Sequence, residues 1–332
     1  MIPVTLDPKG PLKRDPLVPH QMRDRLTRTE DAIILCHLGV PRFERDRWSL
    51  MINGMVKRAH ALPFDELRRY PRTEIGAVHQ CCGSPLAPFA PTRRVCNVKW
   101  AGARLADVLA DCRPSTAAKY VWSYGADYGE FGGVAVDAYV KDLPMARIAE
   151  DVLIAYEMNG SALPAEHGFP ARLVVPGFYG TNSVKWLTRI TFAEHRALEP
   201  FTTRWYNDPV LDGSGRETGE TTPVWPIAPE SLIVSPAPNE TIGPVDAREI
   251  WGWAWADGGV RKVYVRADDA AAWHPADVEP QHGREWQRFS ISWTPVRSGK
   301  FLLSSLAEAT NGQLQPTSGR RNAIYEVPVS VE

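Results

Sequence analysis

The chain has 332 residues, of which 44% are hydrophobic and 23% charged, a length that can bury a large core and is typical of two domains. A formal net charge of -1 gives no global field that would favour nucleic acid or an anionic membrane, so neither is expected as a partner. Five cysteines, an odd number in a long chain, argue against a disulfide scaffold. No apolar run is long enough to span a membrane.

The first 30 residues are rich in proline and charge, which predicts an extended arm over residues 1–30. They contain no apolar signal-peptide region, so the cytoplasm is the expected compartment, or the periplasm if a leader has been removed. From residue 31 to 215 the pattern interleaves strands and short helices. Strands are expected at 48–52, 153–156, 172–175 and 184–190, and amphipathic helices at 64–70 and 104–110. No Gly-rich βα turn occurs, which favours an α+β domain with a mixed sheet over a doubly wound fold.

Residues 216–231 are punctuated by Pro, Gly and Thr, which predicts a linker. From 232 to 332 short alternating strands follow one another between turn clusters. Trp251, Trp253 and Trp255 fall on one face of the first of these strands. Six or seven such strands over this length predict an all-β, immunoglobulin-like sandwich.

The stretch His79-Gln80-Cys81-Cys82-Gly83-Ser84-Pro85 directly follows a strand-like run at 73–78. A stiff strand can aim a side chain into an accessible loop, and a cysteine placed there can act as a soft thiolate ligand. Two other interpretations stay open. One is a zinc site shared with Cys36, His37 and Cys96, although the paired spacings typical of zinc are missing. The other is a set of plain buried cysteines.

Three basic side chains accompany Gly-rich turns further along the chain, namely His167, Arg172 and Lys185. Backbone N–H groups and cations in such turns can cradle a phosphate. The alternative is that each is an ordinary surface charge beside a hairpin.

Five stretches of the chain can be considered together: Gln80-Cys81-Cys82-Gly83, Tyr156-Glu157-Met158-Asn159-Gly160, His167-Gly168-Phe169-Pro170, Val184-Lys185-Trp186-Leu187 and Gly252-Trp253-Ala254-Trp255. Together they resemble the sulfite oxidase family of molybdenum enzymes. They occur in the family's order, and the resemblance extends from about residue 31 to the end of the chain. It implies a molybdopterin-binding core over 31–215, followed by an immunoglobulin-like dimerisation domain over 232–332.

The resemblance also implies roles for individual residues. Cys81 falls where the family has its single protein ligand to molybdenum. Tyr206 matches an active-site tyrosine, and the alternative is a stacked aromatic between the domains. The cofactor-binding residues implied by the resemblance are His167, Arg172, Ser183, Lys185 and Asp137. The implied cofactor is molybdenum held by molybdopterin, with no haem or flavin in this chain. The electrons would pass to an external acceptor such as a cytochrome, and the protein would be a homodimer.

The pattern departs from the sulfite-oxidising members at two places. Ser84-Pro85-Leu86 stands where they have an Asn-Arg-Arg run, and Leu35-Cys36-His37 stands where a second arginine is expected. Anion capture requires convergent guanidinium groups, for which Arg93, Arg94, Arg320 and Arg321 are the candidate substitutes. A pocket lined by Pro85, Leu86, Phe89 and Tyr206 would be more apolar.

We therefore expect oxygen-atom transfer on a small sulfur compound, sulfite or a related one. The alternatives are reduction of an S- or N-oxide on the same cofactor, or a non-catalytic member that serves as an interaction module. A further alternative makes the immunoglobulin-like half a binding domain for another protein.

Overall fold

The computed structural model describes residues 4–14, 16–83, 90–92, 94–243, 247–268, 272–295 and 297–332. The chain forms two compact units, and each unit consists of three segments that are separated in the sequence. The core unit comprises Met1–Arg14, Ile34–Ile75 and Lys99–Trp225. The sandwich unit comprises Asp15–Ile33, Gly76–Val98 and Pro226–Glu332.

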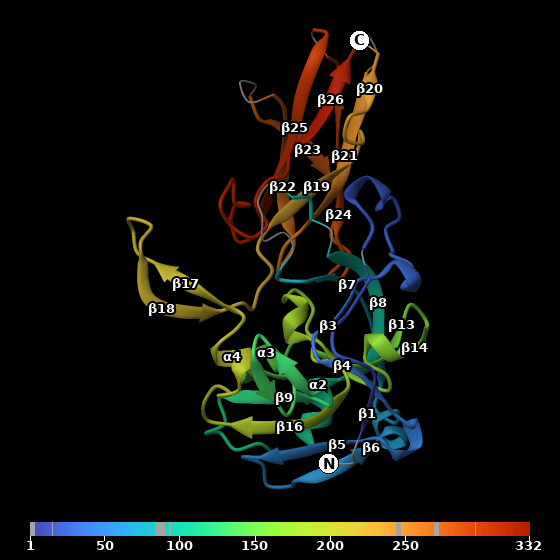
Figure 1. The fold of residues 1–332 in the computed structure, drawn as a ribbon, viewed down its shortest axis with the longest axis vertical. Helices are drawn as coiled ribbons and strands as arrows, with labels where there is room; N and C mark the ends of the chain where they lie inside the picture. Colours follow the sequence, from blue (N-terminus) through green and yellow to red (C-terminus); the bar gives the residue numbers. More distant parts are fainter. Residues whose placement is uncertain are drawn as a thin grey trace. The chain divides into compact units, whose positions relative to one another are not determined.

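The core unit contains a five-stranded mixed sheet (Figure 1). Its strands follow the order β12 (Val140–Pro144), β9 (Tyr120–Gly125), β16 (Leu187–Ala193), β5 (Ser49–Gly54) and β6 (His60–Pro63). The β16–β5 pair is parallel and the other pairs are antiparallel. This confirms the mixed sheet expected from the sequence. The strand predicted at 184–190 begins three residues later than expected, because residues 184–186 belong to the preceding loop.

A second sheet carries two of the motifs that resemble the molybdenum enzymes, since Gln80 ends one of its strands and Tyr156 lies in another. Its order is β14 (Ser161–Ala162), β13 (Leu153–Met158), β8 (Val95–Arg104) and β7 (Arg72–Gln80), with β15 (Arg172–Val174) also paired to β13. Four two-stranded pairs complete the strands outside the sandwich: β1 (Thr5–Lys9) with β4 (Gly39–Arg42), β2 (Leu12–Arg14) with β3 (Ile34–Cys36), β10 (Gly129–Phe131) with β11 (Val134–Val136), and β17 (Asn207–Leu211) with β18 (Glu217–Pro223).

The helices are short, as the sequence predicted. The α-helices are α1 (Phe64–Leu67), α2 (Leu105–Ala110), α3 (Met145–Ile148) and α4 (Pro200–Thr203). The 3-10 helices are η1 (Pro19–Gln21), η2 (Thr29–Asp31), η3 (Arg45–Arg47), η4 (Ala165–His167) and η5 (Gly180–Asn182). The apolar face of α2 packs with strands β5 and β16 through Val108, Ile52 and Ile190, all buried in one hydrophobic cluster.

Eight β-strands dominate the sandwich unit. Their order is β19 (Glu230–Ser235), β21 (Arg248–Trp255), β24 (Gln287–Trp293), β23 (His274–Val278), β22 (Val260–Ala267), β25 (Gly299–Ala309), β26 (Val327–Val331) and β20 (Thr241–Ile242). Ile250, Val263, Phe289 and Leu303 are fully buried in their common core. This arrangement fits the expected immunoglobulin-like domain. Trp253 stacks on Trp286 with 5.0 Å between ring centroids.

The N-terminal arm is integrated into the fold. Within the core unit, β1 pairs with β4 and β2 pairs with β3. Within the sandwich unit, the indole N–H of Trp253 donates to the carbonyl of Met22 at 2.7 Å. The stretch predicted as a linker, 216–231, contains β18 and the first residues of β19.

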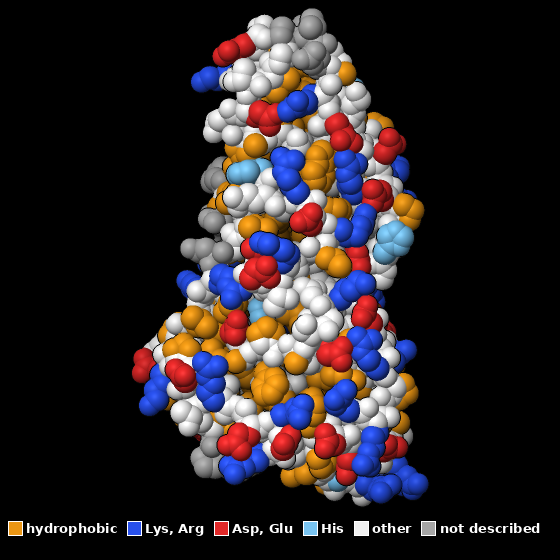
Figure 2. All heavy atoms as spheres, turned by 90° about the vertical axis from the view of Figure 1, so that its right-hand side faces the viewer, with side chains coloured by type: hydrophobic (Ala, Val, Ile, Leu, Met, Phe, Trp, Pro, Cys, Tyr) orange, Lys and Arg blue, Asp and Glu red, His pale blue; other side chains and the backbone are white. Residues whose placement is uncertain are grey.

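Positive and negative side chains are interspersed over the face seen in Figure 2, in keeping with the small net charge. Within the described ranges, no helix is both long and apolar enough to cross a membrane.

Candidate functional site

Cys81 stands in the turn that immediately follows β7, in the sandwich unit. The turn is fixed by backbone hydrogen bonds on both sides: Val78 N–H donates to Arg284 O at 3.0 Å, and Cys81 N–H donates to Arg94 O at 2.9 Å. Cys81 is half-buried, whereas Cys82 is only 5% exposed. The strand therefore presents the first thiol of the pair and hides the second.

The environment of Cys81 favours its thiolate form. Hydrogen bonding from the Cys82 thiol is the main cause that lowers the Cys81 pKa to about 6, and it outweighs the opposing effect of burial. The Gly83 N–H, 3.4 Å from Cys81 Sγ, and the positive charge of Arg94 act in the same direction. A thiolate is the form that binds metals, so this side chain is prepared for ligation.

A buried polar network lies directly behind this cysteine. Gln80, the preceding residue, is fully buried, and its amide nitrogen donates to Glu230 and, at 3.1 Å, to Asn322 Oδ1. Its amide oxygen accepts from the indole N–H of Trp255 at 3.0 Å. Arg321 Nε also donates to the carbonyl of Cys82. The cysteine turn is thus anchored to strands far along the chain.

The three basic residues predicted to cradle a phosphate lie together in the core unit. The guanidinium of Arg172, at the start of β15, donates to His167 O at 3.0 Å and to Ser183 O at 2.9 Å. It therefore joins the end of η4 to the loop after η5. Ser183 itself is buried, and its hydroxyl accepts the N–H of Val175 at 3.0 Å, so this side chain holds the loop together.

Lys185 uses all three of its N–H donors inside the protein. Nζ lies 3.1 Å from Leu35 O, 3.0 Å from Glu166 O and 2.9 Å from Cys36 Sγ. Contact with a cofactor would therefore exchange one of these three partners.

His167 is held in the neutral form between cations. Burial, followed by the charges of Arg172 and Lys185, lowers its pKa to about 3. The side chain is buried, and within the described part of the chain its Nε2 has no hydrogen-bond partner. A buried ring nitrogen without a partner costs about 1–3 kcal/mol unless a ligand satisfies it. This orphaned atom beside two cations fits an anionic, hydrogen-bonding group such as a pterin phosphate.

The buried acid of this region is Asp127, which the sequence analysis did not identify. Burial raises its pKa to about 7, and the Lys185 charge opposes the rise. Asp127 follows β9 after Gly125, where a Cβ would collide with the Asp127 carboxylate, and this Gly-x-Asp spacing was the available signal. Asp137, which the resemblance proposed as a cofactor-binding acid, is exposed just after β11. Its assignment stays a prediction.

Tyr206 contacts a histidine from a distant part of the chain. The phenolic OH of Tyr206 lies 2.6 Å from His37 Nε2. The His37 ring packs against Phe131, with 4.5 Å between centroids, and stacks on Phe201 at 6.1 Å. Tyr206 itself has a φ of 60°, a left-handed conformation that is uncommon for a bulky residue and often marks functional sites.

A buried lysine lies under the same tyrosine. Lys141, on β12, is only 1% exposed, donates to Phe201 O at 2.9 Å and lies 5.4 Å from the centre of the Tyr206 ring. Sequence analysis missed both this residue and the role of His37. Lys141 carried a signal, because it stands with Asp142 between the apolar residues Val140 and Leu143, and charged residues inside such a strand need a reason to be buried.

The arginines considered as anion ligands are only partly accounted for. Ser84, Pro85, Leu86, Phe89 and Arg93 lie outside the described residues. Among the others, Arg320 is exposed, whereas Arg94 and Arg321 donate to the carbonyls of Gly83 and Cys82 respectively.

The zinc interpretation finds no support. No group of three or more His, Cys, Asp or Glu side chains in the described segments could hold a metal ion. All five cysteines are free, in agreement with the expectation that they form no disulfide scaffold. Cys36 contacts the Lys185 ammonium, a cation that would repel zinc.

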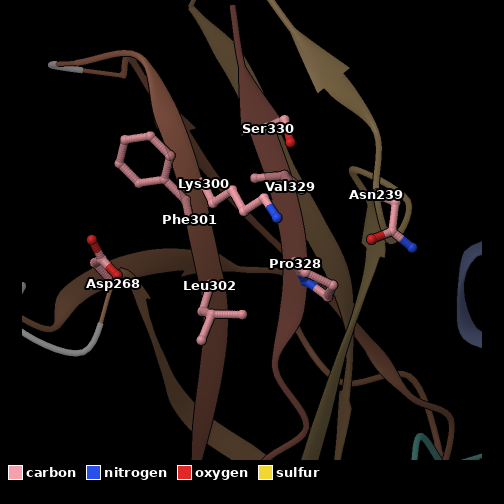
Figure 3. A pocket seen from close by; sticks show the side chains of 8 residues that line it. All are labelled: Asn239, Asp268, Lys300, Phe301, Leu302, Pro328, Val329 and Ser330. Atoms are coloured by element: carbon pink, nitrogen blue, oxygen red, sulfur yellow. The ribbon is translucent and has the colours of Figure 1, made fainter.

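A pocket in the sandwich unit, with a volume of about 380 Å³, involves other residues (Figure 3). It is lined by side chains of β25 and β26, among them Lys300 and Ser330, together with Asn239 and Asp268. None of the residues predicted for the site lines it, so we assign it no role.

The predicted residues thus form three groups. The cradle (His167, Arg172, Lys185) and the Tyr206–His37 pair belong to the core unit, and Cys81 belongs to the sandwich unit.

Comparison with known proteins identifies the same region. Residues 37–201 match the family model described as "Oxidoreductase molybdopterin binding domain". Mitochondrial sulfite oxidase from Homo sapiens is 31% identical over 300 residues, covering 83% of this chain and 54% of the human protein. Sulfite oxidase from Gallus gallus is 32% identical over 309 residues, covering 85% of this chain and 66% of the relative. The chain therefore spans about half the length of the human protein.

A solved structure supports the fold over nearly the whole chain. The sulfane dehydrogenase SoxCD from Paracoccus pantotrophus superposes with a TM-score of 0.78 at 27% identity. The match covers 93% of this chain and 85% of the SoxCD chain. It extends beyond the residues of the family model to both units.

Proposed function

This chain belongs to the sulfite oxidase family of molybdopterin oxidoreductases, and from that premise we propose that it is a molybdenum enzyme acting on a small sulfur compound. When bound, the cofactor supplies oxygen-atom transfer between two metal oxidation states, while the protein supplies binding and electrostatics.

The cradle around His167 is the observation that carries this proposal. A neutral histidine with an unsatisfied buried nitrogen, next to the Arg172 guanidinium and the Lys185 ammonium, is arranged for a ligand with negative charge and hydrogen-bonding atoms. These residues would hold the pterin and its phosphate. Arg172 would act mainly by fixing the end of η4 to the loop after η5, because it donates to the carbonyls of His167 and Ser183.

Cys81 would hold the molybdenum. Its pKa near 6 leaves the sulfur ionised at neutral pH, and a soft thiolate suits a metal that also binds the sulfurs of a pterin. The buried Gln80 network would keep the ligand oriented, which is the usual contribution of residues behind a metal ligand.

Tyr206 and His37 would transfer protons to or from the substrate. A phenol and an imidazole 2.6 Å apart can share a proton, so the pair can hold one at the phenolic oxygen or release it through the ring. The buried charge of Lys141 would favour negative charge on this side of the site.

The related proteins are named for sulfite and sulfane, which favours a small sulfur compound as substrate. The electrons would pass to a separate acceptor such as a cytochrome, and the protein would act as a homodimer.

Metal and pterin analysis of the purified chain tests the cofactor assignment. We expect one molybdenum and one pterin per chain, and a protein purified from molybdenum-replete cells that contains neither would contradict the proposal. With the loaded protein, sulfite and thiosulfate should each be assayed with a cytochrome or a dye as acceptor. Reduction of the acceptor by either compound supports the proposed activity.

Reduction of an S- or N-oxide is the second candidate. The observation that favours it is the replacement of the expected arginines by Ser84-Pro85-Leu86 and by Leu35-Cys36-His37, which removes charge that a sulfur oxyanion would need. A viologen assay with a sulfoxide and an amine N-oxide distinguishes the two directions. A loaded protein inactive in both directions would instead support a non-catalytic interaction module.

A further inference from the structure

Lys185 and Cys36 make an unusually close contact. The distance from Lys185 Nζ to Cys36 Sγ is 2.9 Å, shorter than the 3.1 Å and 3.0 Å that separate the same nitrogen from the carbonyl oxygens of Leu35 and Glu166. Sulfur is a larger atom than oxygen, so an ordinary hydrogen bond to sulfur would be the longest of the three. The order of distances is therefore the reverse of that expected for three simple hydrogen bonds.

The surroundings hold both atoms in this position. Cys36 is 1% exposed and ends β3, where it pairs with Leu12 of β2. The Lys185 ammonium lies 4.4 Å from the centre of the Trp186 ring, and its two carbonyl partners prevent it from turning away. Neither side chain can leave without breaking several contacts. The pair therefore has the proximity that makes a reaction between two side chains effectively intramolecular.

The same surroundings favour the reactive form of the amine. Burial lowers the pKa of Lys185, whereas the neighbouring Cys36 sulfur opposes this effect. A lower pKa increases the fraction of neutral amine, which is the nucleophilic form.

We propose that Cys36 and Lys185 are a modification site at which peroxide links the two side chains through a single oxygen atom, as Sγ–O–Nζ. One molecule of hydrogen peroxide oxidises the Cys36 thiol to sulfenic acid and leaves as water. A second oxidises the neutral amine of Lys185 to a hydroxylamine and also leaves as water. The hydroxylamine oxygen then attacks the sulfenic sulfur, the S–OH bond breaks, and a third water is released.

These three reaction steps balance in atoms and in electrons. Two peroxides accept four electrons, two from sulfur and two from nitrogen, and the linked pair gains one oxygen and loses two hydrogens. The bridge also removes the positive charge of Lys185 from the cradle. Its formation does not depend on the proposed function, because both residues and their contact belong to the polypeptide alone.

Mass spectrometry of the full-length protein tests the proposal. After treatment with hydrogen peroxide and digestion, we expect a cross-linked peptide pair joining Cys36 and Lys185, heavier than the sum of the two free peptides by about 14 Da. Trypsin should no longer cleave after Lys185. Dithiothreitol should separate the two peptides, because it cleaves the S–O bond and returns the sulfur to the thiol, and the Lys185 peptide should keep the hydroxylamine oxygen, a gain of about 16 Da. Recovery of Cys36 only as thiol, sulfinic acid or sulfonic acid, with Lys185 unmodified, would overturn the proposal.

Three variants make the test specific. Cys36→Ser and Lys185→Arg should each abolish the cross-linked pair, and in the second variant Cys36 should proceed to sulfinic acid. Cys112→Ser is the matched control, because Cys112 is another buried free cysteine, and its replacement should leave the cross-link intact. A cross-link of Lys185 that persists in Cys36→Ser would contradict the assignment. Thermal melting shows whether each variant is folded. The test on the wild-type protein does not depend on the variants.

Discussion

Gln80 donates its side-chain amide to the carboxyl group of Glu230, a residue 150 positions further along the chain. Both side chains are buried, with relative exposures of 0% and 2%. Burial raises the pKa of Glu230 well above its ordinary value, and the hydrogen bond from Gln80 only partly opposes this. The raised pKa favours the neutral acid, and Glu230 holds the residue next to the candidate metal ligand.

The raised pKa makes stability depend on pH in a definite direction. Folded Glu230 keeps its proton above pH 4.5, the ordinary value, whereas the unfolded chain loses it. The contribution to the free energy of unfolding is complete below that pH and is lost as pH rises toward the folded pKa. Glu230→Gln has no proton to lose, so its stability relative to wild type should increase between pH 5 and pH 8. Chemical denaturation at both values measures this, and parallel profiles would contradict it.

Loss of the Glu230 carboxyl should also weaken the metal site. Glu230→Ala removes an acceptor of the Gln80 amide, and partners behind a metal ligand typically contribute about 10-fold to 100-fold in metal affinity or activity. We expect a loss of this size in molybdenum content or turnover, measured by elemental analysis and steady-state assay. Glu249→Ala is the control, because Glu249 is an exposed residue of the same sandwich, and it should retain the metal. Equal molybdenum content and turnover in both variants would show that the network does not position Cys81.

Cys82 should control the reactivity of its neighbour. In metal-free protein, alkylation of Cys81 by iodoacetamide should increase with pH around a midpoint near 6, the pKa produced mainly by the Cys82 thiol. Cys82→Ala removes that donor, so the midpoint should move to higher pH. Cys112 is an internal control, since burial raises its pKa to about 11 and it should remain unmodified at pH 7. An unchanged midpoint in Cys82→Ala would exclude this cause.

Local patterns predicted the elements that present the site, but not the contacts that complete it. The strand before Cys81 and the basic residues of the cradle were visible as motifs, because their spacing is set by one strand end and by Gly-rich turns. The Tyr206–His37 bond joins residues 169 positions apart, and such pairing depends on the tertiary fold. The Gln80–Glu230 bond is equally non-local.

Two predictions show where the local sequence pattern is misleading, namely the choice of a buried acid and the length of the first helix. Asp127 and Asp137 both follow strands, and only burial distinguishes them, since the first is 5% exposed and the second lies in solvent. The helix expected over 64–70 is shorter in the structure, where α1 ends at Leu67, because its three C-terminal residues are partly or fully exposed and gain little from packing.

The neutral state of His167 should be visible in the acid stability of the metal-free protein. Its pKa is lowered from 6.5 to about 3, so the unfolded chain binds a proton that the folded chain excludes. The stabilisation is complete above pH 6.5 and is lost as pH falls toward 3. His167→Gln should lose less stability than wild type between pH 7 and pH 4. Thermal melting at both values measures the difference, and an identical loss in the two proteins would contradict a neutral His167.

Removing the hydroxyl of Tyr206 should separate chemistry from cofactor binding. Tyr206→Phe keeps the ring that packs on Phe201 and lies over Lys141, but it breaks the 2.6 Å contact with His37. Positioned proton-transfer groups typically contribute about 100-fold or more to rate, so kcat/KM should fall by at least that factor. Molybdenum content should stay at the wild-type level.

The matched control for Tyr206→Phe is Tyr128→Phe, because Tyr128 is 43% exposed and its replacement removes a hydroxyl from the surface. This control should retain full activity. The pH dependence of kcat/KM is a second measurement, and it should not change if Tyr206 has only a structural role. Loss of the Tyr206–His37 pair should remove one ionisation from this pH profile. If Tyr206→Phe retains both the rate and the profile of wild type, the phenol takes no part in proton movement and the pair serves only to pack the aromatic cluster.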